Sequence, residues 1–105
     1  MTRTIIIIFS VALLFVTCKK KDNPKEETYT PTCSGTKSFV SDVFPLIQSK
    51  CFKCHTNMSD YAQIKSLAAA IKDNVTSGIM PKDDKLTTAQ KDIMVCWVEA
   101  GAPNN

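Results

Sequence analysis

Two of the five cysteines and the only histidine of this 105-residue chain fall within five consecutive residues, Cys51-Phe52-Lys53-Cys54-His55. A folded domain of fewer than about 80 residues buries little apolar surface, and such domains commonly depend on a disulfide, a metal or a covalent cofactor. The other three cysteines, Cys18, Cys33 and Cys96, lie far from this segment in the chain. We therefore expect the cysteines to decide how this domain is held together.

The first 17 residues have the pattern of a secretory signal peptide. Arg3 precedes an apolar run from Ile5 to Val16, which is too short for a bilayer span of about 20 residues. The segment Phe15-Val16-Thr17-Cys18 resembles the end of a bacterial lipoprotein leader. That resemblance implies lipidation of Cys18 and attachment to a membrane. An ordinary cleaved signal followed by an incidental cysteine is the alternative.

Residues 18–32 are predicted to form a flexible tether. Lysine, glutamate, threonine and proline dominate this stretch, and Tyr29 is its only large apolar side chain. Such a composition buries too little surface to offset the entropy of ordering. The folded domain is then expected over residues 33–105. The net charge of +3 is too small for the basic surface of a nucleic-acid binder, so we expect no nucleic-acid partner.

The domain is expected to be all-α, because no segment alternates apolar and polar residues as a strand would. An apolar stripe over residues 38–50 predicts the first helix. If Asp42 caps this helix, Pro45 falls in its first turn, where a missing N–H has no partner to lose. Loops are expected over residues 51–58 and 78–86.

Two further helices follow. The second is predicted to begin near Ser59-Asp60, to bury one continuous face, and to end near Gly78. Thr87 and Gln90 have the spacing of a capping box and begin the third, which Gly101 terminates.

The C-x-x-C-H segment at residues 51–55 is the attachment signature of c-type haem. Cys51 and Cys54 can each add to one haem vinyl group, and the adjacent His55 can then bind the iron from one face. Three other interpretations are a dithiol redox pair, a structural zinc site and a plain disulfide between the two cysteines. The redox pair is disfavoured because the sequence lacks the βαβ pattern of thioredoxin-like folds. The zinc site is disfavoured because His55 is too close in the chain to both thiols for one tetrahedral site. A plain disulfide would leave the histidine unexplained.

The chain resembles the small class I c-type cytochromes of bacteria. The matching segments are residues 39–47 ahead of the C-x-x-C-H motif, Ile79-Met80-Pro81, Leu86-Thr87, and residues 97–104. The resemblance implies three or more short helices wrapped around one covalently attached haem. It also implies that the first and last helices cross, with Phe39 or Phe44 against Trp97.

The resemblance further implies that Met80 is the second axial ligand, opposite His55. It implies a membrane-tethered electron carrier of the cell envelope, facing the periplasm or the outer surface, that exchanges electrons with redox partner proteins and is not itself an enzyme. Two alternatives stay open. One is a haem-based sensor or binder of small ligands, and the other is a haem-free dithiol lipoprotein that handles copper or reduces disulfides.

Two cysteines are left once Cys18 is assigned to lipid and Cys51 and Cys54 to haem. An exported, oxidising setting favours a disulfide between these two, Cys33 and Cys96. Cys33 precedes the first helix and Cys96 lies on the last, and these two elements are expected to pack together. The alternative is that Cys96 is a free buried thiol and that Cys33 belongs to the tether.

Overall fold

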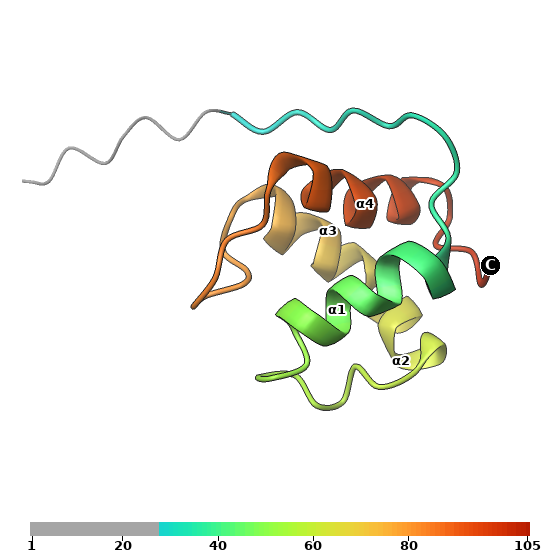
Figure 1. The fold of residues 1–105 in the computed structure, drawn as a ribbon, viewed down its shortest axis with the longest axis vertical. Helices are drawn as coiled ribbons and strands as arrows, with labels where there is room; N and C mark the ends of the chain where they lie inside the picture. The colour runs from blue at the N-terminus through green and yellow to red at the C-terminus, as the bar shows by residue number, and fades with distance from the viewer. Residues whose placement is uncertain (1–27) are drawn as a thin grey trace, which may run out of the picture.

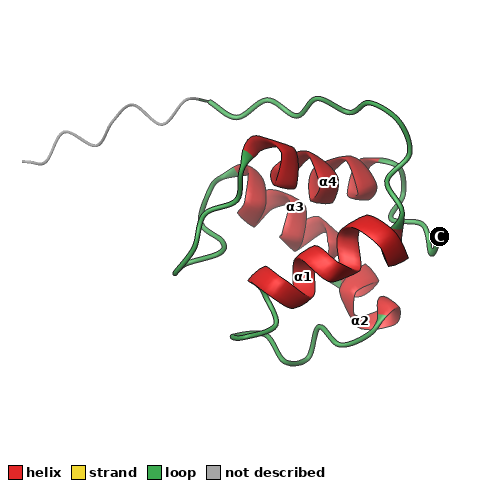
Figure 2. Cartoon of the chain, viewed as in Figure 1, coloured by secondary structure: helices red, strands yellow, loops and turns green. Residues whose placement is uncertain are grey.

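The computed structural model describes residues 28–105, and this part of the chain is helical without strands (Figures 1 and 2). Its elements are a single π-helical turn, η1 (Phe39–Val43), and the α-helices α1 (Phe44–Lys50), α2 (Tyr61–Ser66), α3 (Ala68–Thr76) and α4 (Thr88–Glu99). The expected all-α class is confirmed. The predicted signal peptide and Cys18 lie outside the described residues. Among the helices of residues 28–105, none combines the length and apolar character needed to cross a bilayer.

The first helical segment begins at Phe39, inside the predicted range of residues 38–50, but with a different cap. Ser38 is the cap, because its hydroxyl accepts from the amide of Ser41 at 3.1 Å. The carboxylate of Asp42 returns to accept from the amide of Ser38 at 2.8 Å, so the expectation that Asp42 itself caps the helix was wrong. The amide of Val43 bonds to the carbonyl of Ser38, which makes η1 a wide turn. Pro45 falls in the first turn of α1, as expected.

The second predicted helix is broken in two. Asp60, not Ser59, is its cap, with its carboxylate accepting from the amide of Gln63 at 3.0 Å. The helix ends at Ser66, whose hydroxyl donates to the carbonyl of Gln63 at 2.7 Å, and Leu67 separates α2 from α3 with a non-helical ψ of 3°. The single predicted helix thus becomes two short helices, α2 and α3, separated at Leu67.

The helix α4 follows the sequence prediction closely. Thr87 and Gln90 form a capping box, with Thr87 Oγ1 accepting at 3.2 Å and Gln90 Oε1 accepting at 3.0 Å. Past its end, Gly101 has a φ of 92°, a left-handed conformation that glycine adopts without strain.

Aromatic packing joins the first and last helical segments. The ring of Phe39 lies 5.6 Å from that of Trp97, and 5.0 Å from that of Tyr61. Phe44 reaches this cluster only through Phe39, at 5.5 Å. Of the two candidates for the crossing, Phe39 is therefore the one in contact with Trp97.

The end of the chain closes this crossing. The side chain of Asn105 accepts from the amide of Phe39 at 2.8 Å, and its backbone carbonyl accepts from the amide of Val40 at 3.0 Å. Figure 1 shows the chain end beside the start of the first helical segment. These bonds satisfy amides at the start of η1 that have no partner within the helix.

Residues 28–36 run along α4 as an extended strap (Figure 1). The hydroxyl of Tyr29 donates to the carboxylate of Asp92 at 2.7 Å, and the amide of Thr32 donates to the same oxygen at 3.1 Å. The ammonium of Lys91 lies 5.1 Å from the centre of the Tyr29 ring. The packed part of the chain thus begins by Tyr29, earlier than the boundary at Cys33 that composition suggested.

Candidate functional site

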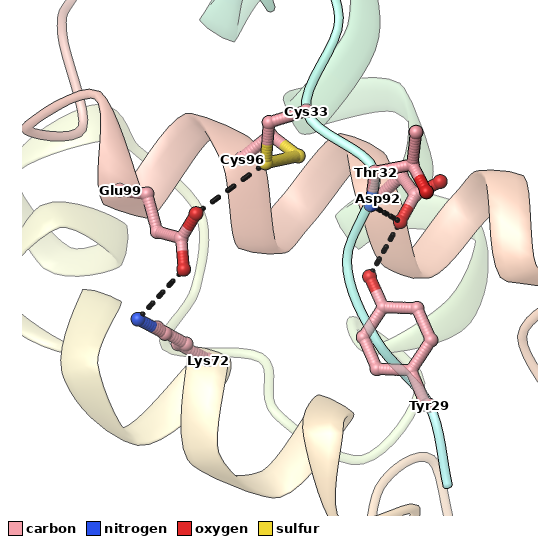
Figure 3. Close-up of a disulfide and its surroundings, with 7 residues drawn as sticks. All are labelled: Tyr29, Thr32, Cys33, Lys72, Asp92, Cys96 and Glu99. Carbon is pink, nitrogen blue, oxygen red and sulfur yellow. Dashed lines mark hydrogen bonds and ion pairs between the residues drawn. A yellow bond between two sulfur atoms is a disulfide. The ribbon is translucent and has the colours of Figure 1, made fainter.

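The four cysteines of the described residues divide into two pairs. Cys33 and Cys96 form a disulfide that joins the strap to α4, with their Cα atoms 5.3 Å apart (Figure 3). A carboxylate oxygen of Glu99 lies 3.4 Å from the sulfur of Cys33, and the other oxygen pairs with Lys72 of α3 at 3.0 Å. A disulfide sulfur carries no proton, so the Glu99–Cys33 approach is a contact and not a hydrogen bond. Cys51 and Cys54 are free thiols.

The C-x-x-C-H segment forms a tight turn at the end of α1. The amide of Cys51 bonds to the carbonyl of Ile47 at 2.8 Å, which attaches the turn to the helix. The amides of Cys54 and His55 both bond to the carbonyl of Cys51, at 3.1 Å and 2.9 Å. These local bonds hold both thiols and the imidazole on one short turn.

The two thiols differ in environment. Cys54 is exposed, whereas Cys51 is half-buried, and burial raises the pKa of the Cys51 thiol above its ordinary value. The buried thiol of Cys51 is thus less readily deprotonated than an exposed one.

Met80 lies on the loop between α3 and α4. Its amide donates to the carbonyl of Asn74 at 3.2 Å, which ties the loop to the C-terminal turn of α3. The bond between Met80 and Pro81 is cis, and the Met80 side chain is half-buried.

Two hollows, of about 240 Å³ and about 320 Å³, share Cys51, His55 and Met80 in their walls. The smaller hollow is largely apolar, and its other apolar side chains come from the loop before α2, from Leu67 and α3, and from α4: Met58, Leu67, Ile71, Val75 and Met94. The larger is bounded by Cys54 and by residues 81–84 of the Met80 loop. The fold thus brings the C-x-x-C-H turn and Met80 to the walls of the same space, although they are far apart in the sequence.

An ion pair crosses the edge of the larger hollow. Lys50, the last residue of α1, pairs with Asp84 of the Met80 loop at 2.5 Å. The hydrogen bond from Lys50, together with one from the amide of Lys85, holds the pKa of Asp84 below its usual range. Lys53, Lys82 and Asp83 also line this hollow.

Sequence reasoning did not assign several side chains to this site. Met58 and Met94 line the smaller hollow and are buried. Val75 continues the face formed by Leu67 and Ile71 at intervals of one helical turn, and this spacing could have identified it. Asn74 also lines the hollow, and no periodic pattern in the sequence marks it.

The donor set limits what the site could hold. Within residues 28–105, no group of three or more His, Cys, Asp and Glu side chains is placed to bind a metal ion. The imidazole nitrogen of His55 and the thioether of Met80 are instead a borderline and a soft donor on a common, largely apolar space. Such a pair suits the two axial positions of a haem iron.

No known protein family, curated protein or solved structure matches this chain.

Proposed function

We propose that this protein is a monohaem c-type cytochrome that carries electrons in the cell envelope. The observation that carries the proposal is the common wall formed by Cys51, His55 and Met80 around the two hollows. The attachment motif alone would supply one ligand to the iron, His55, and two thioether bonds to the haem. The structure adds a space beside the motif and a methionine on its wall.

Each proposed group has a distinct part in holding the haem. The thiols of Cys51 and Cys54 would add across the two vinyl groups, each S–H bond giving up its proton to the vinyl carbon that does not receive sulfur. His55 and Met80 would occupy the axial positions. When bound, the haem supplies a one-electron couple, and a methionine opposite a histidine favours the ferrous state and raises the potential.

The apolar lining supports electron transfer more than catalysis. Leu67, which precedes α3, and Ile71 and Val75 of α3 present apolar side chains to the smaller hollow, and an apolar shell disfavours extra charge on a bound iron. With both axial positions filled by protein, no position is open to peroxide or oxygen. Cys54, one of the two proposed attachment points, is exposed, which supports a haem edge that a redox partner protein could approach.

We further propose that lipid on Cys18 attaches the protein to a membrane, with the domain facing the periplasm or outer surface. Residue 18 lies outside the described residues, and the proposal is supported by the leader pattern around it. Cys18→Ser should move the protein from the membrane to the soluble fraction. Membrane association that survives this change would contradict lipid anchoring.

The haem proposal is tested by expressing the full chain together with a haem c maturation system. The pyridine haemochrome spectrum should report thioether-linked haem, and the intact mass should exceed that of the polypeptide by one haem. Cys51→Ala combined with Cys54→Ala should abolish the covalent mass increase. Cys33→Ala combined with Cys96→Ala is the matched control, because it removes two cysteines and should leave the haem attached. Haem that acid–acetone extracts from the unaltered protein would overturn the proposal.

A further inference from the structure

The loop that carries Met80 has few polar attachments to the rest of the domain. At its start, the amide of Met80 bonds to the carbonyl of Asn74. At its far end, Leu86 is buried in the core. Between them, over residues 81–85, the pair of Lys50 and Asp84 is the one hydrogen bond or ion pair to another element among the described residues.

Both partners of this pair are well placed to hold the loop. Lys50 is the last residue of α1 and directly precedes Cys51, whose amide is bonded to the carbonyl of Ile47. The second oxygen of Asp84 accepts from the amide of Lys85 at 2.7 Å, which orients the carboxylate toward Lys50. The pair therefore joins the Met80 loop to the end of α1, directly before the C-x-x-C-H turn, and lies beside the larger hollow, whose wall contains both Cys51 and Asp84.

We propose that Lys50 and Asp84 form a latch that holds the Met80 loop, and with it Met80, at the wall of the cavity that His55 also lines. They are positioning residues, since they act through the loop and do not reach the proposed iron position. This inference rests on the proposed haem function. It adds that the latch helps to determine how long Met80, the proposed sixth ligand, stays bound to the iron. Opening the latch would free residues 81–85 and favour departure of Met80.

The size of the effect follows from the exposure of the pair. The side chains of Lys50 and Asp84 are 25% and 48% exposed. Ion pairs at such positions make small contributions, so loss of the latch should raise the population of the open loop by a factor of about two to five. High salt screens exposed charges and should open the loop of the unaltered protein in the same way.

The experiment compares Lys50→Met and Asp84→Asn with the unaltered full chain. In haem-loaded protein, imidazole should bind more tightly to each variant by a factor of about two to five, because it competes with Met80 for the iron. Hydrogen exchange at the amide of Met80 should accelerate by a similar factor, whereas exchange at the buried residue Val95 should not change. The charge-swapped double variant, Lys50→Asp with Asp84→Lys, should restore both values.

The second ion pair of residues 28–105 supplies a matched control. Lys72 and Glu99 pair at 3.0 Å with similar exposure but join α3 to α4 away from the loop. Lys72→Met should leave both imidazole affinity and Met80 exchange unchanged. Equal effects of Lys72→Met and Lys50→Met, or no effect of Lys50→Met, would overturn the latch. If no covalent haem forms, the haem proposal fails, and Met80 exchange in the haem-free protein still decides whether the latch exists.

Discussion

The ring of Phe39 lies 5.6 Å from the ring of Trp97, where η1 meets the last turn of α4. Phe39 also contacts Tyr61 at 5.0 Å, so a single side chain joins three helical segments. Its burial explains why these segments, which are distant in the chain, form one core around the site.

Phe39→Ala should lower the free energy of unfolding by about 3–5 kcal/mol, since it leaves a cavity at the aromatic junction. Urea denaturation followed by far-ultraviolet circular dichroism measures this loss. Phe52→Ala is the control, because Phe52 is 39% exposed and buries little surface. Equal unfolding midpoints for the two variants would contradict a structural role for Phe39.

The disulfide between Cys33 and Cys96 closes a long loop, with a sequence separation of 63. In the chain-entropy description, Cys33→Ser should cost up to about 4 kcal/mol of unfolding free energy, and less if covalent haem already restricts the unfolded chain. Alkylation of the unfolded protein, before and after reduction, checks the bond itself. Labelling of both cysteines without reductant would show that they are not paired.

Met80→Ala should remove the far-red charge-transfer band that a methionine–iron bond produces and should lower the reduction potential. Met94→Leu is the matched control, because Met94 also lines the smaller hollow but is fully buried in α4. Loss of the band in Met94→Leu, with the band retained in Met80→Ala, would reassign the sixth ligand to Met94.

The strap should loosen as acid protonates Asp92. The hydrogen bond from Tyr29, followed by that from the amide of Thr32, holds the pKa of Asp92 below its usual range in the folded protein. A carboxyl group whose pKa is lower in the folded state stabilises that state above its unfolded pKa of about 3.9. This contribution is lost as the pH falls from about 3.9 through the lower folded pKa.

Tyr29→Phe should therefore raise the pKa of Asp92 toward its usual value, which carboxyl chemical shifts measured against pH will show. Hydrogen exchange at the amide of Thr32 should accelerate in this variant. The phenylalanine variant keeps an aromatic ring beside the ammonium of Lys91, so the substitution tests the hydroxyl of Tyr29 alone. An unchanged pKa of Asp92 would mean that the Tyr29 hydrogen bond is absent in solution.

The sequence by itself determined the features that depend on residues close together in the chain. The capping box of Thr87 and Gln90 spans one turn, and the turn at Cys51–His55 closes with bonds to the carbonyl of Cys51. The all-α class follows from helical apolar spacing, which also operates over a few residues. Such signals can be read locally because both partners of each interaction lie within about four residues.

Only the tertiary structure decided the features that join distant residues. Composition assigns Tyr29 to a solvated tether, but its hydroxyl donates a hydrogen bond to the carboxylate of Asp92 once α4 has folded. The placement of Met80 and His55 on the walls of the same hollows, and of Asp84 beside Lys50, depends on how α3, α4 and the loop between them pack. Chain entropy opposes each of these long-range contacts, and they form because the apolar core around Phe39 and Trp97 brings their partners together.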